Sequence, residues 1–340
     1  MKDFLKRKGV SLSPKVYFID ALSSMTLGLF ASLIIGLIIK TIGEQAGIAY
    51  LVQIGTTAME LMGPAIGAAV AYGLKAPPLV LFSAIVSGAA GAALGGPAGS
   101  IIAAIISTEI GKLVSKETKI DIIVTPFVTV FTGYSVAAFI GPGIAFIMIR
   151  LGDLIMWGTE QKPIVMGIVV AVLVGLALSG PISSAALALM LDLHGIAAGA
   201  ATIGCAAQMI GFAVSGFREN KIGGLLAIGI GTSKLQIPNI VRNPLILIPP
   251  TIAGALLAPL GTTVFLMENN AAGAGMGTSG LVGQIMTFTT MGFSGEVWLK
   301  VALLHIIGPA LVSLVLSEYM RKKNWIKPGD MLIQIGGERK

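Results

Sequence analysis

Three polar segments interrupt an otherwise apolar chain, and the richest is MENNAAGAGMGTSGLVGQI, which runs from Met267 to Ile285. Its carboxylate and amide groups can make several hydrogen bonds to a sugar-like solute, and its glycines permit close approach of the backbone. A nucleotide-binding loop would end in Gly-Lys-Ser/Thr, and this segment has no lysine. The alternative is a flexible extracellular loop. The residues that we expect to bind a solute here are Glu268, Asn269, Asn270, Ser279 and Gln284.

The second segment is KLQIPNIVRNPLILIPP, Lys234 to Pro250, in which four prolines interrupt a membrane-like stretch. Proline lacks an amide hydrogen and breaks helical bonding, which frees backbone carbonyl groups. Asn239 and Asn243 add amide groups that could bind hydroxyls or a phosphate. We therefore include both in the expected substrate-binding set, although the same sequence would be unremarkable as a loop.

The third segment begins at Ser107 and contains Glu109 and Asp121. A carboxylate in an apolar helix costs about 2.5 to 3.5 kcal/mol on insertion scales, so it usually has a partner or a function. We expect Glu109 to bind substrate and Asp121 to bind an ion or a proton. Glu60, inside another apolar stretch, is a further ion or proton candidate. The alternative for Asp121 is ion pairing at the membrane surface with nearby lysines, namely Lys112, Lys116 and Lys119.

The two histidines and the single cysteine give weaker chemical signals. Asp192 lies just before His194, which suggests a proton relay, so His194 joins the ion or proton candidates. For His305, packing or an interhelical hydrogen bond is the favoured role. Two distant histidines do not form a metal cluster, and we expect no metal and no cofactor. Cys205 lies in an apolar stretch, where a small buried side chain is much commoner than a reactive thiol.

The composition places these segments in a membrane. Of the 340 residues, 55% are hydrophobic and 11% are charged, whereas a soluble domain has about 25% charged residues. The 45 glycines suit close packing of transmembrane helices. The net charge of +7 comes from basic residues at the chain ends and in short loops. This is the positive-inside pattern and not a nucleic-acid surface, so we expect both termini in the cytoplasm.

Apolar segments of about 20 residues predict an all-α, polytopic transmembrane bundle with about ten spans. Residues 1–20 would form a cytoplasmic segment, residues 21–320 the transmembrane domain and residues 321–340 a cytoplasmic tail. The clear spans are Ala21–Lys40, Ile48–Tyr72, Pro77–Leu94, Ser100–Val114, Ile120–Ile140, Pro163–Ser179, Ile196–Phe217, Leu245–Met267 and Val297–Tyr319. Shorter pieces predict broken or re-entrant helices, which are tolerated where they line a cavity. They are Ile144–Trp157, Ile182–Leu193, Gly223–Lys234 and Gly280–Met291.

The chain also resembles itself. The segment STEIGKLVSKETKIDIIVTPF, from Ser107, aligns with GTSKLQIPNIVRNPLILIPPT, from Gly231, and Pro64 aligns with Pro181. This pattern predicts an internal duplication with repeats at about 21–150 and 163–292, and duplicated transporters bind substrate near the midplane. Chance similarity among small residues is the alternative. Basic residues near both repeated loops favour parallel halves, whereas an odd number of spans per repeat would invert them.

The same three polar segments resemble the membrane subunit IIC of bacterial phosphoenolpyruvate-dependent sugar phosphotransferase systems. The segments that carry the resemblance are STEIGKLVSKETKIDIIVTP, GTSKLQIPNIVRNPLILIPP and MENNAAGAGMGTSGLVGQI. The chain is similar to a divergent IIC group that includes perfringolysin O regulator-like proteins, from about Ser11 to about Gly329. The resemblance implies a homodimeric, multi-pass sugar permease of the bacterial inner membrane. It also implies separate IIB and IIA phosphocarrier proteins, because each polar end of about twenty residues is too short for a fused domain.

The resemblance further implies that a pocket glutamate works with a histidine. Glu268 or Glu109 could serve as that glutamate, but the sequence does not identify the histidine. Glu268 could also act as a base that polarises the hydroxyl accepting the phosphoryl group. The chain would be at most the membrane subunit of a phosphotransferase, without a self-contained catalytic site. Two other functions stay open: an ion-coupled secondary transporter of a small polar solute, and a membrane sensor or regulator.

Overall fold

The computed structural model describes residues 2–10, 13 and 16–333 and divides the chain into two compact units, with the boundary between Ile147 and Met148. The described residues form helices and connecting turns, with one isolated backbone bridge between Gly195 and Asn269. This confirms the predicted all-α class. Parts of the expected segments 1–20 and 321–340, including Ser11, lie outside the described residues.

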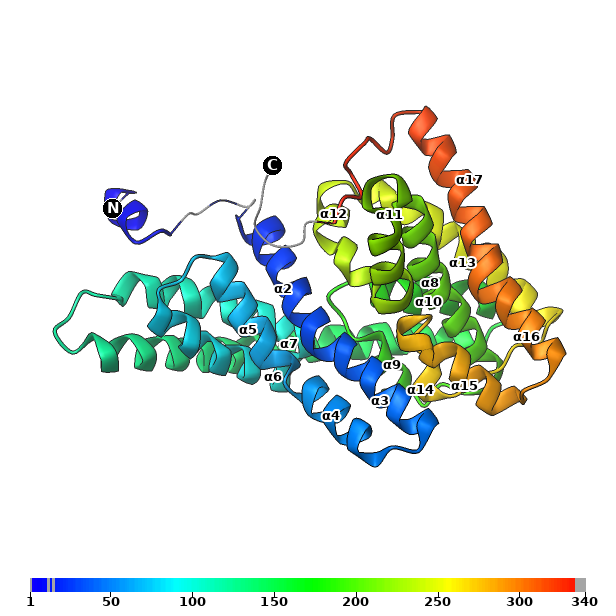
Figure 1. Cartoon of the computed structure of the whole chain (residues 1–340), viewed down its shortest axis with the longest axis horizontal. Helices are drawn as coiled ribbons and strands as arrows, with labels where there is room; N and C mark the ends of the chain where they lie inside the picture. Colours follow the sequence, from blue (N-terminus) through cyan, green and yellow to red (C-terminus); the bar gives the residue numbers. More distant parts are fainter. Residues whose placement is uncertain (1, 11–12, 14–15, 334–340) are drawn as a thin grey trace. The chain divides into compact units, whose positions relative to one another are not determined.

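Unit 1 consists of the helices before Met148 (Figure 1). They are α1 (Lys2–Arg7), η1 (Val16–Asp20), α2 (Ala21–Leu29), η2 (Phe30–Ile34), α3 (Ile35–Ala46), α4 (Ala49–Glu60), α5 (Met62–Gly73), α6 (Pro78–Val114) and the first part of α7 (Asp121–Thr159). The helices α2, η2 and α3 form one continuous candidate span, whereas α4 and α5 form a pair bent by 49°. The predicted span Ile48–Tyr72 is therefore helical but broken.

α6 consists of two helices joined at Gly95 and Gly96, whose backbone angles are φ −154°, ψ 19° and φ 58°, ψ −151°. The second pair of angles is accessible almost only to glycine. A Cβ on Gly91 would lie 2.4 Å from the Gly99 oxygen. In a straight helix these two residues would be about 12 Å apart along the axis, so the two halves of α6 fold back on each other.

Six helices in the described part of the chain are long and apolar enough to cross a membrane, and the bent pair α4–α5 makes a seventh. The protein is therefore a multi-pass helical membrane protein. α6 counts once although its halves match two predicted spans, Pro77–Leu94 and Ser100–Val114. The piece Ile144–Trp157 is not separate, because it continues α7. The expected total of about ten crossings stays a prediction.

Unit 2 is built around α10 (Gly195–Ser215), which packs against α8 (Pro163–Ser179), α13 (Ile248–Thr263) and α17 (Gly308–Lys322) (Figure 1). The most apolar stretch of α10 is 83% buried, the largest share of any candidate span. A Cβ on Gly204 of α10 would lie 2.1 Å from the Ala171 oxygen of α8. Small side chains therefore bring the backbones of the central helices into contact.

Short and interrupted helices surround this core. They are α9 (Ser184–Met190), α11 (Phe217–Leu226), η3 (Ala227–Gly231), η4 (Ser233–Gln236), α12 (Ile237–Arg242), η5 (Pro244–Leu247), α14 (Ala271–Ala274), η6 (Ser279–Leu281), α15 (Val282–Met291), α16 (Gly295–Val301) and η7 (Ala302–Ile307). Three of the predicted broken pieces fall among them, at α9, at η3 and at η6–α15. The breaks therefore concentrate in unit 2, around its most buried helix.

Unit 1 also depends on close helix contacts, and this generates a first prediction. A Cβ on Gly67 of α5 would lie 2.2 Å from the Ala84 oxygen of α6. We expect Gly67→Ala to lower the melting temperature of the purified protein by several degrees, since overpacking costs about 1 to 3 kcal/mol. Scanning fluorimetry in detergent measures the effect. The matched control is Gly143→Ala in α7, where a Cβ meets nothing within 4 Å; equal melting temperatures for the two variants would contradict the prediction.

Candidate functional site

Residues 267–291 form a helical hairpin on α10, which we call the glycine-rich hairpin. Its two arms are α14 and α15, which contact each other and α10. Its turn lies against the middle of α10, where Gly277 has φ +54° and a Cβ would lie 2.6 Å from the Cys205 carbonyl carbon. Both the space and the backbone conformation therefore require glycine at this position.

Asn269 fastens the two arms of the hairpin to α10. Its side-chain nitrogen carries two donors and lies within hydrogen-bond distance of three oxygens, those of Thr202 (2.7 Å), Gly283 (3.0 Å) and Thr287 (3.1 Å). Its side-chain oxygen accepts a hydrogen bond from the next backbone amide at 2.8 Å. Its own backbone amide donates to the Gly195 oxygen at 3.1 Å. Both ends of the amide group thus have protein partners, and the direct solute contact expected for Asn269 stays a prediction.

Glu268, Asn270 and His194 lie together at the open end of the hairpin. The Glu268 side chain is exposed, and the Asn270 side-chain oxygen accepts from the Gly273 amide at 3.1 Å, which caps α14. The bridge between Gly195 and Asn269 brings the exposed His194 to the same end. The Nδ1 atom of His194 lies 2.6 Å from the backbone oxygen of Asp192. The contact is therefore with the backbone of Asp192, whereas the expected proton relay would use its carboxylate. The structure therefore unites two candidates that are far apart in sequence, Glu268 and His194.

Three buried polar groups on or beside the hairpin have an atom without a hydrogen-bond partner in the described part of the chain. They are Thr278 Oγ1, Gln284 Oε1 and His305 Nε2. The Gln284 amide nitrogen lies 3.2 Å from His305 Nδ1, which confirms the expected interhelical bond of His305. Because the amide donates there, Nδ1 accepts and Nε2 carries the proton. The site therefore offers a donor, an acceptor and a hydroxyl that can be either.

A chain of polar groups lies beside the turn of the hairpin. Ser279 Oγ donates to the Gly231 oxygen at 2.7 Å, and Ser233 Oγ lies 3.0 Å from Ser179 Oγ. The buried Lys234 ammonium donates to the Gly180 and Ile182 oxygens at 2.6 and 2.7 Å. These carbonyls follow the end of α8, where a cation is stabilised by the helix dipole. Ser279 and Lys234 thus donate to backbone oxygens at places where the helices are interrupted.

Asn239 and Asn243 lie in another part of unit 2, against the segment that follows α17. The Asn239 side-chain nitrogen donates to the Leu332 oxygen at 3.0 Å. That of Asn243 donates to the Trp325 oxygen at 3.0 Å and to Asp330 at 2.8 Å. Both amides therefore hold the C-terminal segment, and a sugar contact for either of them stays a prediction.

The remaining candidate carboxylates belong to unit 1. Glu109 lies 3.0 Å from Lys112, and Asp121 caps α7 by accepting from the Lys116 amide at 2.7 Å and from Thr125 at 2.6 Å. Glu60 is exposed at the end of α4. Among the described residues no three His, Cys, Asp or Glu side chains are grouped to hold a metal ion. Ion or proton binding by Glu60 and Asp121 stays a prediction.

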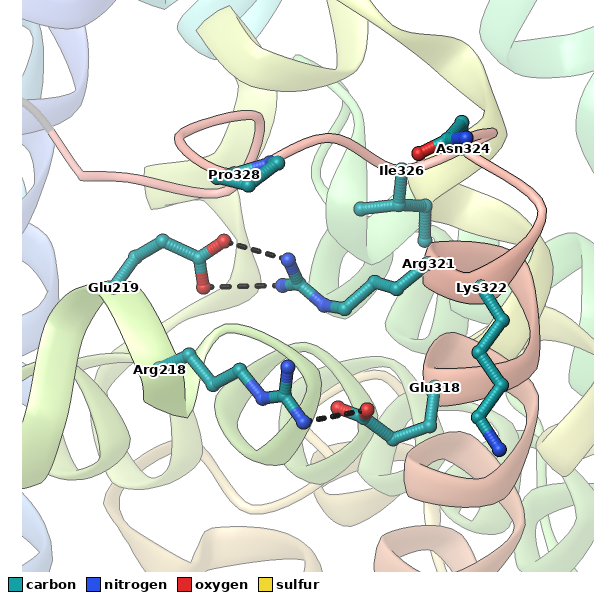
Figure 2. Close-up of a pocket in the computed structure, with 8 residues that line it drawn as sticks. All are labelled: Arg218, Glu219, Glu318, Arg321, Lys322, Asn324, Ile326 and Pro328. Carbon is teal, nitrogen blue, oxygen red and sulfur yellow. Dashed lines mark hydrogen bonds and ion pairs between the residues drawn. The ribbon is translucent and has the colours of Figure 1, made fainter.

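A cavity of about 510 Å³ lies between α11 and α17 in unit 2 and shows a charge pattern that the sequence did not reveal. Arg321 faces Glu219 with two contacts of 2.9 and 3.0 Å, and Arg218 lies 2.7 Å from Glu318 (Figure 2). Lys322 also lines the cavity. Two ion pairs thus neutralise most of the charge in this wall.

The contacts of Asn269 generate a second prediction. Asn269→Ala removes all hydrogen bonds of the side chain, and an unmet buried partner costs about 1 to 3 kcal/mol. We expect the melting temperature to fall by several degrees. Glu268→Ala, which truncates the exposed neighbour, is the control and should melt like the unchanged protein. A normal melting temperature for Asn269→Ala would show that the hairpin does not depend on this clamp.

Comparisons with known proteins agree with the resemblance seen in the sequence. The family model described as Phosphotransferase system, EIIC matches residues 19–333. No curated protein matches, and no solved structure matches. Members of the matched family are membrane components of phosphotransferase systems and work with IIA and IIB partners. The match includes both units and the glycine-rich hairpin, and the chain therefore belongs to the phosphotransferase system EIIC family.

Proposed function

We propose that the protein is the membrane-embedded subunit of a sugar permease and that the glycine-rich hairpin binds the sugar. The observation that carries this proposal is the set of unmet polar atoms on Thr278, Gln284 and His305. A buried polar group without a partner costs about 1 to 3 kcal/mol, so such groups usually have a ligand or an ordered water as partner.

The hydrogen-bonding types in this set suit a polyol. His305 Nε2 carries a proton and Gln284 Oε1 accepts one, while the Thr278 hydroxyl can do either. A sugar hydroxyl donates and accepts at once, so neighbouring hydroxyls could satisfy all three atoms. Asn269 and Ser279 would hold the hairpin in the conformation that presents this set.

Glu268 would act at the open end of the hairpin. An exposed carboxylate can accept a proton from a sugar hydroxyl, and that hydroxyl could then attack a phosphoryl group supplied by a separate IIB protein. Asn270 and His194 lie at the same end and would assist in orienting the sugar. The attacking hydroxyl oxygen would lose its proton to Glu268 as it bonds to phosphorus. The bond between that phosphorus and its donor residue on IIB would break in the same step.

The wider arrangement is also part of the proposal. The protein would be a homodimer in the bacterial inner membrane, with both termini in the cytoplasm, and residues at about 21–150 and 163–292 would be the two copies of a duplication. In support, Lys75 and Asp192 have positive φ, 55° and 46°, shortly before α6 and α10 respectively. α6 is then interrupted at Gly96, and α10 ends at Gly216.

A third prediction concerns sugar binding. We expect Gln284→Leu to weaken binding of the sugar about tenfold, which corresponds to about 1.4 kcal/mol, because the acceptor is lost and His305 loses its partner. A thermal-shift titration with a panel of hexoses and disaccharides identifies the sugar and measures the affinity. Thr289→Val, on the exposed side of the same helix, is the control. Unchanged affinity in the leucine variant would contradict the assignment of the site.

A fourth prediction separates phosphotransfer from binding. We expect Glu268→Gln to bind the sugar with an affinity close to that of the unchanged protein but to abolish uptake into cells. The amide keeps hydrogen-bonding capacity and cannot take a proton at neutral pH. Membrane expression of the variant is the control. Normal uptake by Glu268→Gln would rule out its role as a base.

The same protein in proteoliposomes tests the class of transporter. Sugar that enters in phosphorylated form, and only with IIB and a phosphoryl donor present, supports the proposal. Uptake of unmodified sugar driven by an ion gradient alone would instead favour an ion-coupled secondary transporter.

A further inference from the structure

A cationic cavity of about 480 Å³ lies in unit 1, where the end of α1 meets the loop that follows α6. Four cations are among its lining residues, Arg7, Lys8, Lys112 and Lys116. The only carboxylate in that lining is Glu117. The cavity wall therefore has a clear excess of positive charge.

Two of these cations are fixed in the wall. The Lys112 side chain is 2% exposed, and its ammonium donates to three oxygens, those of Gly9 (2.8 Å), Leu74 (3.1 Å) and Glu109 (3.0 Å). The Lys8 side chain is 9% exposed, donates to the Ser115 oxygen and lies 2.5 Å from Glu117. Charges held in place by the protein lose little conformational freedom when a ligand binds.

The other two cations are open to solvent. Arg7 is 66% exposed and lies 3.2 Å from Glu117, and Lys116 is exposed on the loop. The hydrogen bond from Lys8 lowers the pKa of the Glu117 carboxyl, so this group is ionised at neutral pH. Glu117 and, through its contact with Lys112, Glu109 then face four cations, and the exposed pair of Arg7 and Lys116 can turn toward an incoming anion.

The backbone of Lys116 is held in an unusual conformation at the cavity. Its φ is +61°, in the left-handed region that residues other than glycine seldom adopt. The bond from its amide to Asp121 and the bond from the Glu117 amide to the Val114 oxygen, 3.2 Å long, maintain the turn. Such conformations cluster at binding sites, where the surrounding structure supports them. Here the turn places two charged side chains in the cavity wall.

The charge excess of the unit 2 cavity is smaller, because its three cations, including Lys322, meet two carboxylates. There, both arginines have carboxylate partners, Arg218 with Glu318 and Arg321 with Glu219 (Figure 2). In unit 1, Arg7 and Lys8 share one carboxylate, and Lys116 is open to solvent. The exposed side chains of Arg7 and Lys116 are therefore the part of this charge that a ligand can reach.

We propose that the cavity of unit 1 binds a phosphate group. A guanidinium fork with ammonium groups beside it is a common arrangement for phosphate oxygens. The cavity lies in the loop between the candidate spans of α6 and α7, at the level where lipid headgroups begin. Basic pockets at this level bind anionic headgroups. The phosphate belongs either to an anionic lipid or to a free phosphate compound.

The test compares Lys116→Gln with Lys119→Gln in the full-length protein. Both lysines are exposed and lie on the same loop, but only Lys116 lines the cavity. Native mass spectrometry from detergent micelles that contain phosphatidylglycerol and phosphatidylcholine measures how much of each lipid stays bound to the protein. Thermal shift with sodium phosphate against sodium chloride of equal ionic strength measures free phosphate. Arg7→Gln provides a second variant.

We expect Lys116→Gln and Arg7→Gln each to weaken binding about tenfold, since each removes a charge-assisted hydrogen bond, while Lys119→Gln binds like the unchanged protein. Preferential loss of phosphatidylglycerol supports a lipid headgroup as the ligand. Loss of the phosphate-specific thermal shift, with lipid binding unchanged, supports a free phosphate compound. Absence of both kinds of binding in the unchanged protein, or equal effects of Lys116→Gln and Lys119→Gln, would overturn the proposal.

Discussion

A helix break that faces lipid meets no water, so the backbone groups that it exposes need partners from the protein unless the break lines a cavity. This constraint explains several of the polar side chains inside unit 2. Asn269 donates to the Gly283 oxygen, Ser279 to the Gly231 oxygen and Ser184 to the Gly275 oxygen. Lys234 serves two carbonyls beyond the end of α8. These partners satisfy backbone groups of the hairpin and of the breaks beside it.

The same constraint separates supporting residues from residues that could contact a solute. A side chain whose donors and acceptors already bind the backbone, such as Asn269, has little capacity for a ligand. Gln284 and His305 bind each other and leave one buried atom each without a partner in the described structure. In an apolar interior the number of unsatisfied donors and acceptors matters more than the residue type. A ligand can add hydrogen bonds only to donors and acceptors that have no partner in the protein.

The sequence predicts the helical membrane class, the family and most of the breaks, because each depends on local composition. The gap between the predicted spans Pro77–Leu94 and Ser100–Val114 coincides with the fold-back of α6, and short apolar pieces mark α9, η3 and α15. Contacts between residues that are far apart in the sequence cannot be predicted in this way. Nothing near Asn243 in the sequence indicates that it binds Asp330, and Thr202 is far from Asn269. Glu268 and Asn269 are adjacent, yet one is exposed and the other buried. Such assignments need the tertiary contacts, which a pattern of residue types does not contain.

The single cysteine can be labelled chemically to measure how often the interior of unit 2 becomes accessible. Cys205 is completely buried in α10, and its thiol points to the Val174 oxygen of α8 at 3.7 Å. A maleimide reagent can reach this sulfur only when the packing around the middle of α10, by α8 and by the turn of the hairpin, opens. The rate of labelling therefore measures how often the centre of unit 2 opens, and fraying at its surface does not contribute. Because the chain has one thiol, the labelling experiment can use the unchanged protein, with no other cysteines to remove.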